Sequence, residues 1–475
     1  MLYDRTQSLS AAEMGLIHQA SMKVLAENGI RFADSETLEV FKNRGFKVEG
    51  NQVYFTEERV IKALETAPDR FRFHARNPEN SRWIGRNDYA LAPTYGPPFI
   101  IEPDGTQKPG TLADYEKAVK LAQTSPVIDF HAFKYLAPND IPAATSYLDM
   151  VRAALVLSDK PLMGSTDHKG AAENTMKIME LVFGEKYLDD HPVTMGLINP
   201  LSPLSYSSEM SSSILAFAAR RQPVIVHNMI MAGVSGPIRL PSLMALINAE
   251  VLGGIVLAQL VNPGTPVVYG SNSCPIFMKT SGAECASPQS MWIFSAVTQL
   301  ARYYGLPCRT GGSLTDSHLP DAQAMAEGSL IMTTTIRNGA NVVLHAFGQI
   351  GCFIGISFEK WIMDEEIAGY MKDICQQYPI TPETLDVDSI IDAGSGGSYI
   401  TRKETGQLCR KAFYKHLTFN KFDEAGWKKE GGLDMVTKAQ KTIEQRLGNY
   451  REPDMDPALV KDIDKLVAKM KESHH

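Results

Sequence analysis

The sequence has few cysteines, and their arrangement argues against two common kinds of small domain. Its 475 residues include only 6 cysteines, at positions 274, 285, 308, 352, 375 and 409, which form no CxxC pair and no Cys/His spacing of a zinc finger. A disulfide scaffold would carry more cysteines at closer spacing. We therefore expect free thiols in a reducing compartment and no metal site.

Long clusters of basic residues are also absent. Lys and Arg number 47 against 54 Asp and Glu, so the formal net charge is −7. A protein that binds nucleic acid needs a basic surface that neutralises phosphates. The composition therefore argues against nucleic-acid binding.

Neither a secretion signal nor a membrane span is evident. The first 15 residues lack a basic region followed by an apolar one. The longest apolar stretch, residues 243–261, contains Asn248, Glu250 and Gln259, which favours a helix buried in protein. We therefore expect a cytoplasmic protein. With 44% hydrophobic residues, a chain of this length can form a large core.

Short strand-like runs recur eight times along the middle of the chain. They end near Tyr95, His131, Thr166, Asn199, Asn228, Ser271, Arg309 and His345. Helical segments separate most of them, and this alternation is typical of a parallel sheet covered by helices. Eight such units predict an α/β fold, the (β/α)8 TIM barrel. The alternative is a doubly wound open sheet, but that fold would need an early Gly-rich phosphate turn, and none is present.

The barrel pattern divides the chain into three regions. Residues 1–85 form a helical and mixed N-terminal extension, in which Ser10 caps a helix that ends near Gly29. Residues 86–360 form the barrel. Residues 361–475 form a C-terminal helical region that contains a GSGGS turn at 394–398. A long helix, expected to start in the run that begins at Gly351, leads into this region. Both additions offer surfaces for a homo-oligomer.

Two cationic or potentially cationic residues end neighbouring strands. Arg309 closes one strand and His345 closes the next, so both should point into the mouth at the C-terminal end of the barrel, where function resides in this fold. Such a pair would hold an anion. Aromatic residues in nearby segments, Tyr95, Phe353 and Phe358, would form a wall for a cation. A betaine, with a carboxylate at one end and a quaternary ammonium at the other, fits this description.

Structural roles remain open for these residues. Arg309 could form an ion pair at the barrel rim, and His345 could be a hydrogen-bonded core histidine. His131, His168 and His227 also lie at strand ends, where we favour a supporting role.

Several longer motifs run through the chain. They are TYGPPFII, STDH, GLINPLSPL, GSNSCP, CRTGGSLTDSHLPDAQAMAE and GGSYITRKETGQLCRKAFY. Together they resemble the trimethylamine methyltransferase (MttB) family, above all its branch without pyrrolysine, which includes glycine betaine, proline betaine and carnitine methyltransferases. The resemblance covers nearly the whole chain.

The resemblance implies a TIM barrel that moves a methyl group from a quaternary amine to the Co(I) corrinoid, a cobalamin, of a separate partner protein. It implies no catalytic acid or base, since loss of a methyl group from a quaternary ammonium expels a neutral amine. The position equivalent to pyrrolysine would lie near His318, and Asp316 and His318 would shape the loop over the mouth. Glu404-Thr405 stands where trimethylamine enzymes have His-Thr, which argues against trimethylamine as substrate.

Two other functions remain open at this stage. One is a barrel lyase or aldolase that forms a Schiff base with Lys134 or Lys169, both near strand ends. The other is a betaine-binding protein without catalytic activity.

Overall fold

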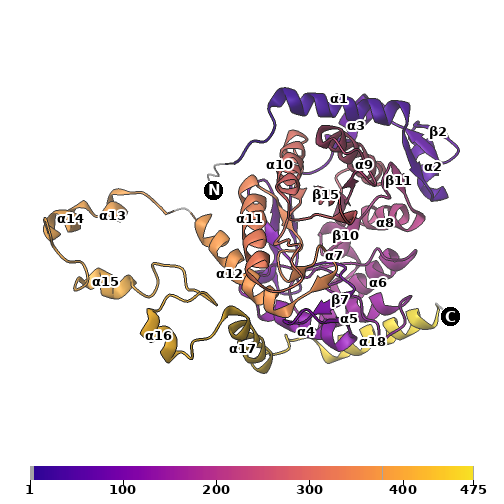
Figure 1. The fold of residues 1–475 in the computed structure, drawn as a ribbon. Helices are drawn as coiled ribbons and strands as arrows, with labels where there is room; N and C mark the ends of the chain where they lie inside the picture. Colours follow the sequence, from indigo (N-terminus) through magenta and orange to yellow (C-terminus); the bar gives the residue numbers. More distant parts are fainter. Residues whose placement is uncertain (1–4, 377, 474–475) are drawn as a thin grey trace.

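A parallel sheet curled into a barrel forms the centre of the molecule (Figure 1). The computed structural model describes residues 5–376 and 378–473. Seven strands pair in the order β6 (Ala90–Leu91), β18 (Val342–Val343), β17 (Cys308–Arg309), β14 (Val267–Ser271), β12 (Val224–Asn228), β10 (Thr194–Ile198) and β9 (Leu162–Met163). All neighbouring pairs are parallel, and every residue of these strands is buried.

A short extended segment closes the barrel between its two end strands. His131 forms an isolated parallel bridge with Leu162 of β9. On the other side, the backbone N–H of Asp129 donates to the carbonyl of Leu91 in β6 at 2.9 Å. Residues 128–131 thus occupy the eighth strand position, so the predicted (β/α)8 barrel is confirmed.

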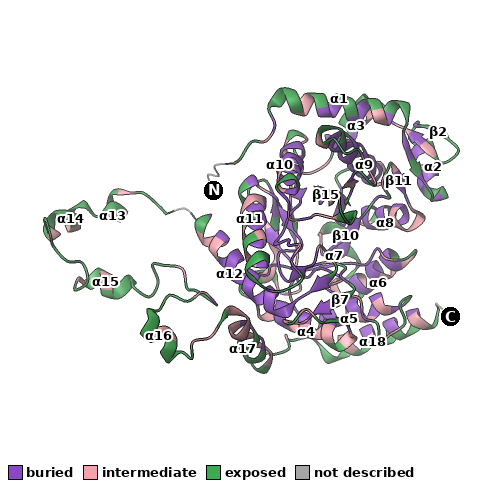
Figure 2. Cartoon of the chain, viewed as in Figure 1, coloured by how far each residue is buried: buried purple, intermediate pink, exposed green. Residues whose placement is uncertain are grey.

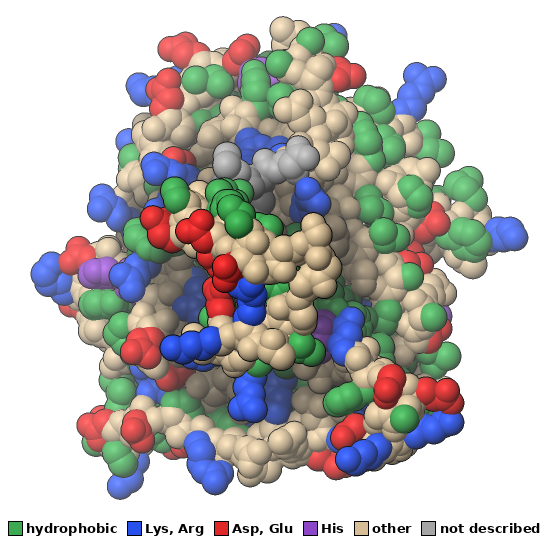
Figure 3. All heavy atoms as spheres, turned by 90° about the vertical axis from the view of Figure 1, so that its left-hand side faces the viewer, with side chains coloured by type: hydrophobic (Ala, Val, Ile, Leu, Met, Phe, Trp, Pro, Cys, Tyr) green, Lys and Arg blue, Asp and Glu red, His purple; other side chains and the backbone are tan. Residues whose placement is uncertain are grey.

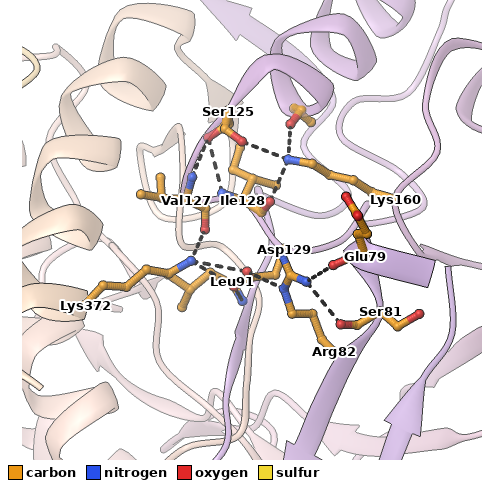
Figure 4. Close-up of polar contacts among 11 residues, drawn as sticks. Glu79, Ser81, Arg82, Leu91, Ser125, Val127, Ile128, Asp129, Lys160 and Lys372 are labelled. Carbon is orange, nitrogen blue, oxygen red and sulfur yellow. Dashed lines mark hydrogen bonds and ion pairs between the residues drawn. The ribbon is translucent and has the colours of Figure 1, made fainter. Parts of the chain in front are cut away.

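The side chain of Asp129 stabilises this closing segment (Figure 4). Its Oδ2 accepts the backbone N–H of Leu91 at 3.0 Å, while Arg82 and Lys372 donate to its Oδ1 at 3.0 and 3.2 Å. The carboxylate is buried, with 5% of the residue exposed. The buried carboxylate of Asp129 therefore accepts a hydrogen bond that a regular neighbouring strand would accept with a backbone carbonyl, and its cationic partners stabilise its charge.

Lys160 secures the turn that leads into the same segment (Figure 4). Its ammonium group donates to three backbone carbonyls, those of Ala122, Ser125 and Ile128, at 2.8, 2.9 and 2.7 Å. Burial lowers the pKa of Lys160 to about 8, although the nearby carboxylate of Asp129 opposes the shift. Lys160 therefore has a structural role.

A helix follows each strand position. The eight are α4 (Leu112–Thr124), α5 (Ser146–Leu157), α6 (Ala171–Phe183), α8 (Ser208–Ala219), α9 (Leu240–Val261), α10 (Pro288–Tyr303), α11 (Ala322–Asn338) and α12 (Phe358–Ile374), with a short α7 (Glu185–Asp190) after α6. Sequence signals define their ends: Asp321 caps α11, and Gly339 ends it in a left-handed conformation. The predicted helices between the strands are confirmed.

Helix α9 is the apolar stretch noted in the sequence. It is the one helix among the described residues that is long and apolar enough to cross a membrane, but 83% of its most apolar window is buried inside the protein. It packs on α1 (Ala11–Glu27) and on the barrel strands. The prediction of a buried helix is therefore confirmed.

The N-terminal region covers one side of the barrel. After α1 come β1 (Ile30–Phe32), α2 (Ser35–Asn43), β2 (Lys47–Glu49), β3 (Gln52–Tyr54), α3 (Glu57–Leu64), β4 (Arg70–Phe73), the 3-10 turn η1 (Pro78–Asn80) and β5 (Arg82–Gly85). Ser10 and Glu13 form a capping box at the start of α1, as the Ser10 cap predicted. β1 also pairs with β11 (Ser205–Tyr206), which attaches this layer to the barrel.

Short strands form a rim above the C-terminal ends of the barrel strands. They are β7 (Phe99–Ile101), β8 (Gln107–Pro109), β13 (Met231–Ala232), β15 (Cys274–Phe277), β16 (Gly282–Ala283), β19 (Gln349–Ile350) and β20 (Gly355–Ile356). The hairpin β19–β20 stands where we expected a helix to start, so that prediction was wrong at its N-terminal end. α12 begins only at Phe358, and the domain boundary expected at residue 360 falls within it.

The C-terminal region leaves the barrel and returns to it. Its helices are α13 (Pro382–Leu385), α14 (Val387–Ala393), α15 (Lys403–Leu408), α16 (Glu424–Lys429), α17 (Met435–Gly448) and α18 (Pro457–Glu472). α17 packs on α12 and α4, and α18 packs on α5. Residues 378–415, here called the arm, extend away from the body, and nearly all of the arm is exposed (Figures 1 and 2).

Candidate active site at the mouth of the barrel

Arg309 is a fully buried arginine at the C-terminal end of β17. Its exposed fraction is 0%, and Nη1 donates to Nε2 of His227, which lies near the end of β12. Nε and Nη2 have no hydrogen-bond partner among the described residues, and no described carboxylate pairs with the guanidinium. Buried polar groups are almost always satisfied, so two orphaned nitrogens on a buried cation point to a missing ligand.

His227 is oriented by Asn199 at the end of β10. Nδ1 of the ring lies 2.8 Å from the side-chain oxygen of Asn199. Because that oxygen can only accept, Nδ1 carries the proton and Nε2 accepts from Arg309. Burial, and then the charge of Arg309, hold the pKa of His227 well below its usual value. The ring is therefore neutral and positions the guanidinium without cancelling its charge.

His345 lies two residues after the next strand, β18, and has a left-handed backbone with φ +57°. Nδ1 accepts from the backbone N–H of Tyr95 at 3.2 Å, and the Thr94 hydroxyl lies at the same distance. The proton of the neutral ring is thus on Nε2, which forms no hydrogen bond with another described residue. Burial, and then Arg309, hold the pKa of His345 well below its usual value. His345 is therefore a neutral donor near a cation.

One aromatic ring, that of Phe353, adjoins these polar groups, and a second aromatic residue, Tyr95, contacts His345 through its backbone N–H. The ring of Phe353 meets that of His345 edge-on, with centroids 4.9 Å apart. Tyr95 is half-buried, and its ring lies 6.5 Å from that of Phe133. Arg309, His227, His345, Tyr95 and Phe353 form one group, here called the Arg309 cluster.

The net charge of the cluster is positive. Burial lowers the pKa of Arg309 to about 9, so the guanidinium still carries its charge at neutral pH. Both histidines are neutral. A buried cation without a counter-charge is costly, and an anionic ligand would offset that cost.

Two glycines explain why this stretch of sequence folds so tightly. A Cβ at Gly270 of β14 would lie 2.8 Å from the carbonyl oxygen of Arg309 and 3.2 Å from its Cβ. A Cβ at Gly312, where φ is +133°, would lie 2.6 Å from the Leu344 carbonyl and 2.7 Å from that of His345. Only glycine fits at both positions. The Gly-Gly turn after Arg309 therefore brings its loop directly against β18.

Asp316 and His318 lie in the loop that follows this turn, beside a cleft of about 570 Å³. Asp316 accepts the backbone N–H groups of Cys285 and Ala286 at 3.1 and 3.2 Å. His318 is exposed and lies against Gly351, next to the hairpin that carries Phe353. Both residues belong to the rim of the mouth, and neither has a hydrogen bond to the Arg309 cluster.

Phe358 has different neighbours. It is the first residue of α12, and its ring lies 4.1 Å from the ammonium nitrogen of Lys117 and 6.4 Å from the ring of Trp361. The structure therefore places Phe358 among the outer helices and does not bring it to Arg309 and His345, because the β19–β20 hairpin intervenes.

The two lysines considered for a Schiff base are engaged elsewhere. Lys134 donates to Asp167 at 2.9 Å, and Lys169 is 70% exposed with its nearest carboxylate, Asp34, at 4.0 Å. Neither provides the desolvated free amine that a Schiff-base mechanism needs.

The sequence singled out Arg309 and His345, but it gave His227 only a supporting role and omitted Asn199 from the site. The signal for both was their position: each ends a strand adjacent in the barrel to another strand of the site. Adjacency of β10 and β12 accounts for the Asn199–His227 pair, whereas β14 lies between β12 and β17, so the contact of His227 with Arg309 spans one strand.

Comparisons of the chain with known proteins agree on one family. The family model described as Trimethylamine methyltransferase (MTTB) matches residues 2–475. The chain is 40% identical over 452 residues to the glycine betaine methyltransferase of Desulfitobacterium hafniense strain Y51, covering 95% of this chain and 94% of that protein. It is 32% identical over 467 residues to the proline betaine:corrinoid methyltransferase of Eubacterium limosum, covering 94% of each.

A solved structure supports the fold. The monomethylamine methyltransferase MtmB of Methanosarcina barkeri superimposes with a TM-score of 0.50 at 11% identity, covering 91% of this chain and 87% of that one. At that identity the likeness concerns the fold alone. The family match and the two relatives confirm the resemblance noted in the motifs, and the chain belongs to the trimethylamine methyltransferase (MttB) family.

Proposed function

We propose that this protein transfers a methyl group from a betaine to the Co(I) corrinoid of a partner protein. The observation that carries the proposal is the buried guanidinium of Arg309, which has two unpaired nitrogens at the mouth of the barrel. The identity of 40% to a glycine betaine methyltransferase supports the same substrate class. The name of the proline betaine relative supports a corrinoid protein as partner.

The carboxylate of the betaine binds to Arg309 and His345. The free Nε and Nη2 of Arg309 offer two parallel donors, the geometry that suits a carboxylate. The Nε2–H of His345 supplies a third donor, because Nδ1 is already used. A ligand carboxylate would thus satisfy the groups that the protein leaves unpaired.

The quaternary ammonium lies against aromatic rings. Phe353 contacts His345 edge-on, so its ring borders the carboxylate site. Tyr95 lies on the neighbouring strand end beside Phe133, and burial holds the pKa of its hydroxyl well above the usual value, which keeps that hydroxyl neutral. The π faces of neutral rings attract a methylated ammonium without competing for the carboxylate site.

The reaction needs positioning more than proton transfer. The Co(I) of the corrinoid, the second substrate, supplies the nucleophile. As the new bond to the methyl carbon forms, the N–CH3 bond breaks and its electron pair stays on nitrogen, which leaves as a neutral tertiary amine. No proton moves, which suits a site whose histidines are both neutral. The residues hold one N-methyl group toward the open end of the barrel, and Asp316 and His318 shape the rim there.

The direct test mixes the purified protein with glycine betaine and a Co(I) corrinoid and follows the cobalt spectrum. Conversion to methyl-Co(III) with release of dimethylglycine supports the proposal. Binding of glycine betaine without conversion would indicate the betaine-binding alternative. Borohydride trapping of a substrate adduct on Lys134 or Lys169 would indicate a lyase. The described cysteines are all free thiols, which supports a cytoplasmic setting for this chemistry.

The arm supports a further part of the proposal, a homo-oligomer. None of the residues in α13, α14 and α15 is buried. Large apolar side chains are exposed along the arm, among them Tyr378, Ile380, Leu385, Ile391, Ile400 and Phe413. Figure 3 looks onto this side of the molecule, where the arm stands in front of the body with hollows beside it. Exposed apolar surface of this extent is typical of an interface, and we propose a second copy of the chain as its partner.

Light scattering during size-exclusion chromatography tests the oligomer. The double variant Ile380→Asp/Ile400→Asp should be monomeric, while Leu16→Asp, which adds a charge at an exposed leucine of α1, should leave the oligomer intact. A monomeric wild-type protein would contradict this part of the proposal.

A further inference from the structure

Three potential metal ligands meet at the rim of the barrel mouth, each from a different loop. Cys285 follows β16, Asp316 lies in the loop between β17 and α11, and Cys352 lies in the β19–β20 hairpin. The two sulfur atoms and a carboxylate oxygen all lie within 4.8 Å of one another. We propose that this group, here called the Cys-Asp-Cys cluster, binds one zinc ion.

The ligand types suit zinc. Two thiolates and one carboxylate form the three-ligand protein set of an open tetrahedral site, with the fourth position left for water or another molecule. The Sγ of Cys285 lies 3.0 Å from Oδ1 of Asp316. On binding, the two thiols release their protons to solvent and Zn²⁺ takes the place of both, so the step needs no oxidant or reductant.

The surroundings hold the carboxylate in place. The two oxygens of Asp316 accept the backbone N–H groups of Cys285 and Ala286. The backbone N–H of Asp316 donates to Glu327 at 3.0 Å. Metal-binding carboxylates commonly have such outer hydrogen bonds, which fix their orientation.

The backbone at Cys352 is also unusual. Cys352 and Phe353 are consecutive residues with φ of +48° and +71°, a left-handed conformation that is strained for residues other than glycine. The N–H of Cys352 donates to the Thr315 carbonyl at 2.9 Å, which ties the hairpin to the loop of Asp316. This turn directs Cys352 to the cluster and Phe353 to His345.

The fourth position has access to solvent. Asp316 and Cys352 are partly exposed, and both line the cleft of about 570 Å³ at the rim, together with Glu284 and His318. An ion could therefore enter from this cleft. The site goes beyond the proposed methyl transfer and does not depend on it. Since Cys352 precedes Phe353, zinc would brace the turn that positions one wall of the mouth.

The sequence had led us to expect no metal site. The cysteines showed no metal-binding spacing because the ligands are far apart in the chain, and only the closing of the barrel brings their loops together. Among the described cysteines, the other four, Cys274, Cys308, Cys375 and Cys409, do not join this group of ligand atoms.

The test measures bound metal rather than activity. The full-length protein is reduced, stripped with EDTA, incubated with excess Zn²⁺ under anaerobic conditions, desalted and analysed by mass spectrometry of the metal. We expect about one zinc per chain in the wild type and in Cys409→Ser, whose thiol is exposed on the arm. Cys352→Ser and Asp316→Asn should reduce the bound zinc to background.

Cobalt loading tests the ligands without a substitution, which keeps the inference falsifiable if the variants fold poorly. Co²⁺ in the wild type should give thiolate-to-cobalt charge-transfer absorption in the near ultraviolet and the visible bands of a tetrahedral ion. A wild-type protein that retains no zinc and shows no such bands overturns the site.

Discussion

Replacing Arg309 with methionine separates ligand binding from folding. The guanidinium is fully buried, makes one hydrogen bond to His227 and leaves Nε and Nη2 unpaired. Methionine has similar length and adapts to irregular space. The variant loses one hydrogen bond of about 1 kcal/mol. It also removes a buried, unpaired charge, whose desolvation costs several kcal/mol. We therefore expect the ligand-free variant to be more stable than the wild type, by roughly 1–4 kcal/mol.

Binding should change in the opposite direction. Loss of a charge-assisted pair in a dry pocket costs on the order of 2–4 kcal/mol. At about 1.4 kcal/mol per factor of ten, the dissociation constant for glycine betaine should rise roughly 30- to 1000-fold. Urea unfolding without ligand and calorimetric titration with glycine betaine measure the two effects.

Arg302 provides a matched control. It is an arginine of α10 whose burial also lowers its pKa, but its Nη1 donates to the carbonyl of Asn338. Arg302→Met should destabilise the protein slightly and leave betaine binding unchanged. If Arg309→Met instead destabilised the protein and bound glycine betaine as the wild type does, Arg309 would be a structural residue and the site would be wrong.

Two other predictions concern buried charges. Because burial lowers the pKa of Arg309 to about 9 and binding needs the charged form, betaine affinity should be constant below pH 9 and fall about tenfold per pH unit above it. Affinity that is flat up to pH 11 would contradict the lowered pKa of Arg309. The substitution Asp129→Ala leaves Arg82, Lys372 and the Leu91 N–H without their acceptor and should cost about 3–5 kcal/mol in urea unfolding. Asp464→Ala, which breaks a partly exposed ion pair with Arg152, should cost less than about 1 kcal/mol. Similar costs for both aspartates would mean that Asp129 does not close the barrel.

The regular parts of the barrel could be predicted from the sequence. Alternating apolar strands and helices indicated the fold, and parallel neighbours necessarily bring consecutive strand ends together. This is why Arg309 and His345 could be assigned to one mouth. The left-handed backbone of His345 and the tautomers of both histidines depend on contacts between distant segments, which no local pattern records.

The irregular parts could not be predicted in the same way. The strands of the β19–β20 hairpin have two residues each, too few for a periodic signal, so the run after Gly351 was interpreted as a helix. Phe358 was assigned to the mouth because it follows the eighth strand, whereas the structure places it beside Lys117. The closing segment at residues 128–131 was predicted as a strand ending near His131, but the side-chain hydrogen bonds of Asp129 and Lys160 that hold it have no sequence signature.

The most direct test of the central claim compares glycine betaine with choline in the methyl-transfer assay. Both carry the same trimethylammonium group, but choline has a hydroxymethyl group in place of the carboxylate. Our account predicts that glycine betaine methylates the Co(I) corrinoid, and that choline reacts at least about a hundredfold less efficiently because it cannot pair with Arg309. Equal rates for the two compounds would contradict the carboxylate site, and no reaction with any betaine would contradict the proposed function.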